Sequence, residues 1–236
     1  MADMRIGILN ADAVKAEFVS DFGEYPDMFS RLLMAVDPCT EFVTYEVMSG
    51  EYPADIDEVD AYLITGSKLS VYDDVAWINI LKEFVRKLHG AKKKLVGICF
   101  GHQLVAEALG GKTRQASQGW CVGVHKAKLT VDAAAYGPAE AEFQLLSNHK
   151  DQVEKMAIGA ELLASTDACP IAMTQLGGHI LTFQGHAEFD KGYALGLLNM
   201  RREILGESVY QTAVDTLPQA TDNSQVARWV LDFVGT

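Results

Sequence analysis

The sequence predicts an α/β fold in which a doubly wound, mostly parallel sheet is flanked by helices, with antiparallel strands added in the second half. In the first half, short apolar runs alternate with helical patterns, which favours parallel strands joined by helices. The second half contains segments of alternating polarity and a Gly-Gly turn, a pattern typical of antiparallel hairpins.

The parallel part of the sheet is predicted from three apolar runs that are short and bounded by polar or glycine residues. They are RIGILN (5–10), DAYLIT (60–65) and KLVGIC (94–99). Between the second and third runs, residues 73–90 carry apolar side chains at helical spacing, and Gly90 is a candidate C-cap. The residues after Cys99 again have helical spacing and end in two glycines.

The antiparallel part is predicted from residues 122–132 and 171–189, which alternate in polarity. A turn at 177–178 makes the second of these segments a hairpin. Two helical patterns follow, joined by a polar loop. The helices are predicted over residues 190–205 and 223–234, and the loop lies near Pro218.

The composition indicates a globular chain with an acidic surface. Of the 236 residues, 49% are hydrophobic and 22% charged, and no linker divides the chain, so we expect a single domain over residues 1–236. The net charge of −12 disfavours nucleic acid and membranes as partners; the basic block Lys92–Lys94 is interpreted as a solvated connection. No run has membrane-spanning length and the N-terminus has no secretory pattern, which predicts a cytoplasmic protein.

The cysteines give no sign of a metal site. Four of them are scattered along the chain without the spacing of metal ligands, and disulfides are not expected in a cytoplasmic protein. They are Cys39, Cys99, Cys121 and Cys169. Three are best interpreted as small apolar residues, whereas Cys99 stands between two glycines where a strand pattern ends and a helical pattern begins.

This setting of Cys99 is typical of a catalytic nucleophile. Residues 97–101 form a G-x-C-x-G motif, the sulfur counterpart of a nucleophile elbow. The two glycines let strand and helix pack closely around a strained turn, and the helix N-terminus favours a thiolate. The backbone N–H of Phe100 would face the oxygen of the attacked carbonyl. The alternative interpretation is a packed cysteine in an ordinary strand-to-helix turn.

A nucleophilic cysteine needs a base, and the sequence offers six histidines. His186 is the preferred candidate because Glu188 follows two residues later, on the same side of an extended segment, where a carboxylate can orient the ring. Taken alone, this H-x-E pattern is more typical of a surface strand with two polar residues. His102 lies in the helix after Cys99 and is a candidate structural residue, while His149 either lines the site or caps a turn.

Two motifs together resemble the class I glutamine amidotransferase family, whose triad is Cys-His-Glu. They are GICFGHQ (97–103) and FQGHAEF (183–189). The resemblance implies a flavodoxin-like fold, with Cys99 as nucleophile, His186 as base and Glu188 as the residue that orients it. It further implies that Gln103 helps to hold the substrate and that neither a metal nor an organic cofactor is needed.

Other segments match the family with departures. Residues 64–74, ITGSKLSVYDD, lie where the family keeps its SGGP oxyanion loop, so the N–H of Ser67, beside Gly66, would join that of Phe100. SNHKDQV (147–153) resembles the family's SHxDxV segment and makes His149 a candidate substrate-binding residue. Gly185 replaces the bulkier residue of FQFHPE beside the histidine, and we expect a wider pocket there.

These features look more like the branch that includes γ-glutamyl peptidases than like glutaminase domains fused to synthetases, and we expect no fused synthetase segment. The resemblance implies hydrolysis of the γ-glutamyl amide bond of glutamine or a γ-glutamyl compound through a cysteinyl thioester, releasing glutamate and ammonia or an amine. One alternative is a glutaminase subunit that supplies ammonia to a separate synthetase partner. Another is a catalytically silent domain for binding or regulation.

Overall fold

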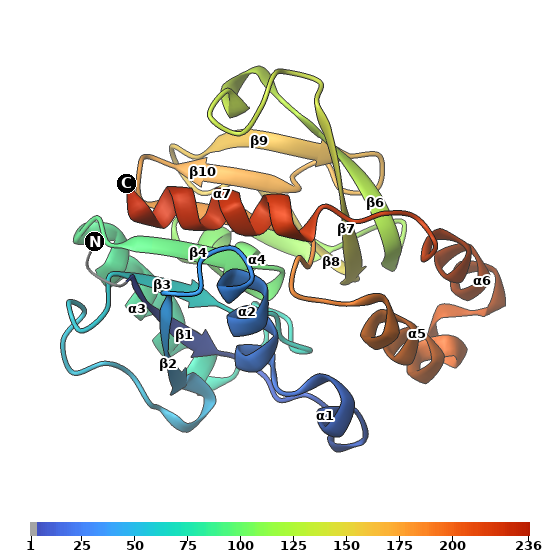
Figure 1. Cartoon of the computed structure of the whole chain (residues 1–236), viewed down its shortest axis with the longest axis horizontal. Helices are drawn as coiled ribbons and strands as arrows, with labels where there is room; N and C mark the ends of the chain where they lie inside the picture. Colours follow the sequence, from blue (N-terminus) through green and yellow to red (C-terminus); the bar gives the residue numbers. More distant parts are fainter. Residues whose placement is uncertain (1–3) are drawn as a thin grey trace.

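A nine-stranded mixed sheet runs through the molecule in the computed structural model, which describes residues 4–236 (Figure 1). The strands lie in the order β2-β1-β3-β4-β11-β10-β9-β6-β7. In chain order they are β1 (Arg5–Asn10), β2 (Glu41–Glu46), β3 (Ala61–Ile64), β4 (Lys94–Ile98), β6 (Cys121–Leu129), β7 (Glu142–His149), β9 (Glu161–Thr166), β10 (Met173–Leu176) and β11 (Ile180–Phe183). A small second sheet pairs β5 (Lys112–Gln115) with β8 (Asp151–Lys155).

The sheet changes direction halfway across. From β2 to β11 all neighbouring strands are parallel, and from β11 to β7 all are antiparallel. The prediction of a mostly parallel first half extended by antiparallel strands is therefore confirmed. The turn between β10 and β11 uses Gly177 with φ +54°, a backbone conformation that a glycine adopts without strain.

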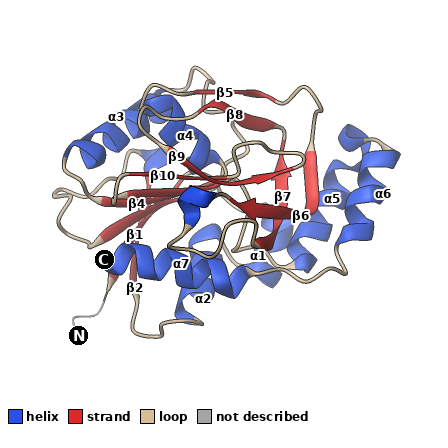
Figure 2. Ribbon diagram, turned by 90° about the horizontal axis from the view of Figure 1, so that it is seen from above, coloured by secondary structure: helices blue, strands red, loops and turns tan. Residues whose placement is uncertain are grey.

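Helices cover the sheet on both faces, which completes the doubly wound layering (Figure 2). They are α1 (Ala16–Phe22), α2 (Tyr25–Met34), α3 (Ala76–Gly90), α4 (Phe100–Ala108), α5 (Lys191–Leu205), α6 (Glu207–Thr216) and α7 (Asn223–Gly235), with short 3₁₀ turns at Val47–Ser49 and Val131–Ala133. Helices α2 and α7 share one buried apolar cluster with the sheet, α3 and α4 share another, and α5 and α6 pack against β6 and β7. The last pair thereby stands at the antiparallel end of the sheet.

Several sequence predictions need correction. The polar loop predicted between the last two helices contains α6, whose buried side chains are Tyr210 and Ala213 alone. Gly90 is the last residue of α3, and Ala91 takes the C-cap position in a right-handed conformation. Strand β6 ends at Leu129, because the chain turns into a 3₁₀ segment inside the predicted 122–132 strand.

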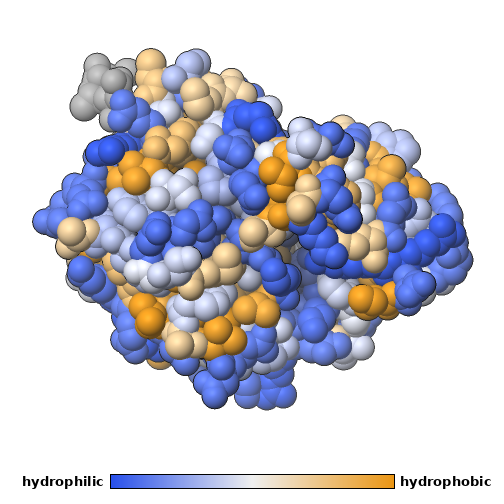
Figure 3. All heavy atoms as spheres, turned by 90° about the horizontal axis from the view of Figure 1, so that it is seen from below, coloured by the Kyte–Doolittle hydropathy of each residue, from blue (hydrophilic) through white to orange (hydrophobic). Residues whose placement is uncertain are grey.

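Figure 3 shows the hydropathy of one face of the molecule. Seen from below, the surface is mostly hydrophilic, and its hydrophobic residues form scattered spots (Figure 3). Within residues 4–236 no helix has both the length and the apolar character needed to cross a membrane.

Candidate active site

Cys99 occupies the sharp turn that joins β4 to α4. Its backbone has φ +51° and ψ −97°, a strained conformation for a residue with a side chain. Its N–H donates a hydrogen bond of 2.8 Å to the carbonyl of Phe183, at the end of the neighbouring strand β11. The turn is therefore held in place by the central parallel strands.

The two flanking glycines permit this turn by their lack of side chains. A Cβ added at Gly97 would lie 2.7 Å from the carbonyl of Gly101, and one added at Gly101 would lie 2.7 Å from the carbonyl of Ile64. Both distances are too short for a real side chain, so strand and helix approach each other as the G-x-C-x-G motif predicts. Cys99 is thereby placed as the N-cap residue of α4, beside the free N–H groups of the first helical turn.

His186 and Glu188 form a buried pair beside this turn. Nδ1 of His186 lies 2.6 Å from Oε1 of Glu188, and both residues are buried. The ring of Phe189 stacks on the His186 imidazole with centroids 4.0 Å apart and planes 5° from parallel. The His186 N–H also donates to the carbonyl of Leu146 at 2.8 Å. The imidazole is thus fixed by a carboxylate, an aromatic face and its own backbone.

The charge state of His186 follows from its neighbours. Burial lowers the pKa of His186, but the Glu188 carboxylate and the Cys99 sulfur together raise that pKa to about 10. Because Glu188 takes Nδ1, the other ring nitrogen, Nε2, is left for the sulfur of Cys99.

Gly66 lies where the nucleophile and the imidazole meet. A Cβ added there would be 3.2 Å from Cε1 of His186 and 3.8 Å from Cβ of Cys99. Three distant segments, the loop after β3, the turn after β4 and the segment after β11, therefore converge at one point. The structure brings together the residues that the sequence motifs single out.

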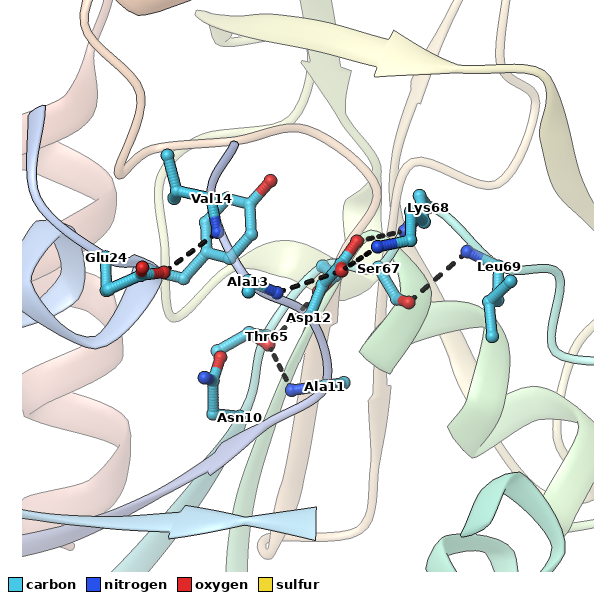
Figure 4. Close-up of polar contacts among 12 residues, drawn as sticks. Asn10, Ala11, Asp12, Ala13, Val14, Glu24, Thr65, Ser67, Lys68 and Leu69 are labelled. Atoms are coloured by element: carbon cyan, nitrogen blue, oxygen red, sulfur yellow. Dashed lines mark hydrogen bonds and ion pairs between the residues drawn. The ribbon is translucent and has the colours of Figure 1, made fainter. Parts of the chain in front are cut away.

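The loop after β3 is anchored by the loop after β1 (Figure 4). Asp12 accepts two hydrogen bonds from Lys68, one from its backbone N–H and one from its ammonium group, each 2.8 Å long. Thr65 accepts from the N–H of Ala11 at 2.9 Å. The N–H of Ser67, by contrast, has no acceptor among residues 4–236 and is free for a ligand oxygen.

Gln103 lies in the wall of the site but has little freedom. Its amide nitrogen donates to the carbonyl of Asp151 at 2.7 Å and to the side-chain oxygen of Gln184 at 3.1 Å. Gln184 in turn donates to the sulfur of Cys99 at 3.5 Å. Both amide hydrogens of Gln103 are thus used inside the protein, which leaves its side-chain oxygen as the group that a substrate can reach.

His102 and His149 are both buried histidines without a charge. Burial lowers the pKa of His102 to about 4, and its ring nitrogens bind Thr182 and the carbonyl of Ile171, as befits a structural residue. Burial also lowers the pKa of His149 to about 3; its Nδ1 donates to the Asp151 carbonyl, and its Nε2 has no partner within residues 4–236. His149 lines the pocket around Cys99 and also a second, small cavity, and it is the one residue that the two have in common.

Gly185 lies in the wall of that second cavity and outside the pocket that contains Cys99. A Cβ added at Gly185 would lie 3.0 Å from Cβ of Leu145, so a neighbouring side chain already fills the space that the glycine leaves. The expectation that Gly185 widens the substrate pocket is therefore not met by this packing.

The pocket around Cys99 is formed by five parts of the chain. They are the loop at 67–69, the start of α4, the turn at 148–151 between β7 and β8, and the side chains of Trp120 and Arg201. Sequence reasoning did not find Asp12, Gln184 or Arg201. Only Gln184 gave a signal, because it stands two residues before His186 in the FQGHAEF motif.

Comparisons with known proteins identify the family of this chain and agree with its fold. A family model described as glutamine amidotransferase class-I matches residues 19–194. A glutamine amidotransferase-like protein of Schizosaccharomyces pombe is 32% identical, covering 98% of this chain and 99% of its own. Gamma-glutamyl peptidase 3 of Arabidopsis thaliana is 32% identical over 74% of this chain and 68% of its own.

The fold is shared with solved structures of the same class. A glutamine amidotransferase from Methylobacillus flagellatus superimposes with a TM-score of 0.76 at 19% identity, over 99% of this chain and 93% of its own. One from Thermotoga maritima gives a TM-score of 0.74 at 14% identity, over 99% and 97%. The family match over residues 19–194 and the full-length relative lead to one conclusion: the chain belongs to the class I glutamine amidotransferase family.

Proposed function

We propose that this protein hydrolyses the γ-glutamyl amide bond of glutamine or a γ-glutamyl compound, with Cys99 as nucleophile, His186 as acid and base, and Glu188 as the residue that orients His186. The observation that carries the proposal is the placement of His186, whose Nδ1 lies 2.6 Å from the carboxylate of Glu188 and whose ring meets Cys99 beside Gly66. An arrangement of this kind provides a nucleophile and a proton donor side by side.

The first half of the reaction forms a thioester. The Cys99 thiolate attacks the γ-carbonyl carbon, and the carbonyl electron pair moves to oxygen. When the C–N bond breaks, the imidazolium of His186 gives its proton to the departing nitrogen, so that ammonia or an amine leaves. Glu188 keeps the ring in the tautomer and orientation that this transfer requires.

Two backbone N–H groups are proposed to stabilise the oxyanion. Phe100 is the first residue of α4, and its N–H belongs to the unsatisfied end of the helix. The N–H of Ser67, in the loop beside Gly66, has no acceptor among residues 4–236. Donors fixed in this way stabilise charge in the transition state without having to reorganise.

The second half of the reaction releases glutamate. Neutral His186 takes a proton from a water molecule as the water attacks the thioester; a C–O bond forms and the C–S bond breaks. The sulfur leaves as a thiolate, and the imidazolium is restored for the next cycle. Every step uses groups of this chain, substrate and water.

We also propose that residues 1–236 form a single domain, because the strands of the nine-stranded sheet run from β1 near the start of the described residues to β11 in the second half.

The relatives favour γ-glutamyl compounds as substrates. Full-length similarity to a glutamine amidotransferase-like protein fits either glutamine or a γ-glutamyl peptide, whereas several relatives of 28–33% identity are named gamma-glutamyl peptidases. We therefore place peptides with a γ-glutamyl residue first and free glutamine second. The alternative of a glutaminase subunit differs in one measurable respect, which is its need for a synthetase partner.

The test is an assay of the purified protein without any partner. Glutamine and a set of γ-glutamyl dipeptides are supplied in turn, and free glutamate is measured. We expect turnover of at least one γ-glutamyl substrate, its loss in Cys99→Ala, and its retention in Cys39→Ala, which removes an exposed cysteine far from the turn. Activity only after addition of a synthetase would support the glutaminase subunit. No turnover, with no labelling of Cys99 by a glutamine-like diazoketone, would support a silent domain.

A further inference from the structure

Arg201 brings a cationic group into the pocket that contains Cys99. Its side chain extends from α5, at the antiparallel end of the sheet, and lines this pocket together with Trp120 and Asn148. The guanidinium carbon lies 5.2 Å from the centroid of the Trp120 ring, and Nη1 donates to the side-chain oxygen of Asn148 at 2.7 Å. The group is therefore held in one orientation before any substrate arrives.

This cation has no carboxylate partner in the part of the chain that the structure describes, residues 4–236. The side chain is half-buried, and its only hydrogen bond is the one to Asn148, so that Nε and Nη2 have no acceptor there. Burial lowers the pKa of Arg201, although a guanidinium stays charged at any physiological pH. Keeping an unpaired charge partly out of water costs free energy, so this position favours the binding of an anionic ligand.

The neighbouring Arg202 shows what a surface arginine does in the same helix. It is exposed and forms a two-point contact with the carboxylate of Glu207. The helix thus turns one arginine towards water with its own acid, and the next one into the pocket without an acid. The pocket also receives Lys68 and Lys150, in a chain whose net charge is −12. Of these, Lys68 is already neutralised by Asp12.

The substrate proposed above supplies an anion of fitting chemistry. A γ-glutamyl group carries an α-carboxylate, separated from the reacting γ-carbonyl by a short chain of three carbons. A guanidinium with a free edge binds such a carboxylate through two parallel hydrogen bonds. We propose that Arg201 binds the α-carboxylate of the γ-glutamyl substrate, and that this protein therefore selects γ-glutamyl compounds whose α-carboxylate is free; the inference rests on the proposed function.

The experiment compares two substrates that differ in this group alone. They are L-γ-glutamyl-p-nitroanilide and its α-methyl ester; the leaving group, p-nitroaniline, carries no carboxylate. We expect the wild-type protein to prefer the free acid in kcat/KM by roughly 10- to 100-fold, as for loss of a charge-assisted hydrogen-bonded pair. In Arg201→Met the preference should fall to about one, chiefly through a higher KM for the acid, because the lost contact is made in the ground state and transition state alike.

Two further variants separate recognition from folding. Arg201→Lys keeps the charge without the planar fork and should retain part of the preference. Arg202→Met removes an arginine from the same helix and should keep the full preference. Hydrolysis of the ester serves as the internal reference, since a variant that has merely lost its fold loses both activities.

The outcomes distinguish the inference from the proposed function. If Arg201→Met still prefers the free acid as strongly as the wild type, the inference is wrong while the hydrolase proposal stands. A wild-type protein that cleaves acid and ester equally well would contradict the inference in the same way. If the wild type cleaves neither compound, and Cys99 forms no acyl adduct detectable by mass spectrometry, the proposed function fails and the inference fails with it.

Discussion

Asp12 holds Lys68 by two hydrogen bonds of 2.8 Å, one to the backbone N–H and one to the ammonium group (Figure 4). The two residues belong to loops that follow neighbouring parallel strands, β1 and β3, so the contact ties two carboxyl-end loops of the sheet together. Asp12 is buried, whereas the Lys68 side chain is largely exposed. The hydrogen bond from the backbone N–H of Lys68 fixes the peptide group between Ser67 and Lys68. It thereby holds Ser67 in place, and the N–H of Ser67 is the proposed second oxyanion donor.

The first prediction separates the two halves of this contact. Asp12→Ala removes both hydrogen bonds and frees the loop, and we expect kcat to fall by roughly 10- to 100-fold with a smaller change in KM, because a misplaced oxyanion donor acts in the transition state. Lys68→Met removes only the exposed ammonium contact and should change kcat by no more than about threefold. Steady-state kinetics on one γ-glutamyl substrate measures both. Equal losses in the two variants would contradict a role for the backbone contact.

The second prediction concerns pH and the pair formed by His186 and Glu188. The pKa of His186 in the folded protein is raised to about 10, above its ordinary value of about 6.5 in an unfolded chain. The folded state therefore binds the proton more tightly, and this contribution to stability is complete below about pH 6.5 and is lost as the pH rises towards 10. Glu188→Gln removes the carboxylate that raises the pKa, and with it much of this dependence.

Urea unfolding at pH 6.5 and at pH 9.5 measures this effect. The loss of unfolding free energy between the two pH values should be larger in the wild type than in Glu188→Gln. Other groups that titrate in this range are common to both proteins and cancel in the comparison. The same variant should lose activity by roughly 10²- to 10⁴-fold, the usual contribution of a positioned acid–base group. An identical pH dependence in the two proteins would mean that His186 is not protonated in the fold.

The third prediction tests the chain of amides that ends on the sulfur. Gln184→Met removes the donor to Cys99 and leaves one amide hydrogen of Gln103 without its acceptor. A buried group left unsatisfied costs about 1–3 kcal/mol of unfolding free energy, and we expect a loss of that size. Gln211→Met on the exposed face of α6 serves as the control and should change stability by less than about 0.5 kcal/mol. A neutral Gln184→Met would show that the amides do not act as one network.

Sequence patterns were sufficient for the elements with strong periodicity and for the motifs made of neighbouring residues. The buried parallel strands have continuous apolar runs, α3 has apolar residues at helical spacing, and the Cys99 turn lies within five consecutive residues. Helix α6 was not predicted, because its buried residues are Tyr210 and Ala213 alone and their neighbours are mainly polar. Strand β2 at 41–46 was not predicted for a similar reason. It lies at the edge of the sheet and most of its residues are partly or fully exposed, so it has no buried apolar run.

Residues that join the site through tertiary packing could not be predicted. Arg201 and Arg202 are consecutive in the sequence and carry the same side chain, yet one lines the pocket and the other faces water. Their difference depends on how α5 packs on the sheet, and local sequence does not encode that rotation. Asp12 likewise contacts Lys68 only because β1 and β3 are neighbours in the sheet, which the local sequence does not show.

The last prediction uses Gly66, where the loop, the nucleophile and the imidazole meet. In Gly66→Ala the new methyl group would lie 3.2 Å from Cε1 of His186, too close for unstrained contact, so the ring must shift by a few tenths of an ångström. Because proton transfer depends steeply on the position of the ring, we expect kcat to fall by roughly 10- to 100-fold. Gly90→Ala, at the end of α3 with no heavy atom within 4 Å of the new methyl group, is the matched control.

The control should leave kcat unchanged and raise the melting temperature slightly, since alanine is a better helix residue than glycine. Thermal melts of both variants show whether Gly66→Ala remains folded, which separates a displaced imidazole from a lost fold. If Gly66→Ala keeps wild-type kcat while folded, then either the ring tolerates the shift or it does not transfer the proton. A crystal structure of that variant shows whether the ring has moved. A displaced ring with wild-type kcat would contradict the role proposed for His186, whereas a ring in its original place would mean that the loop at Gly66 has given way instead.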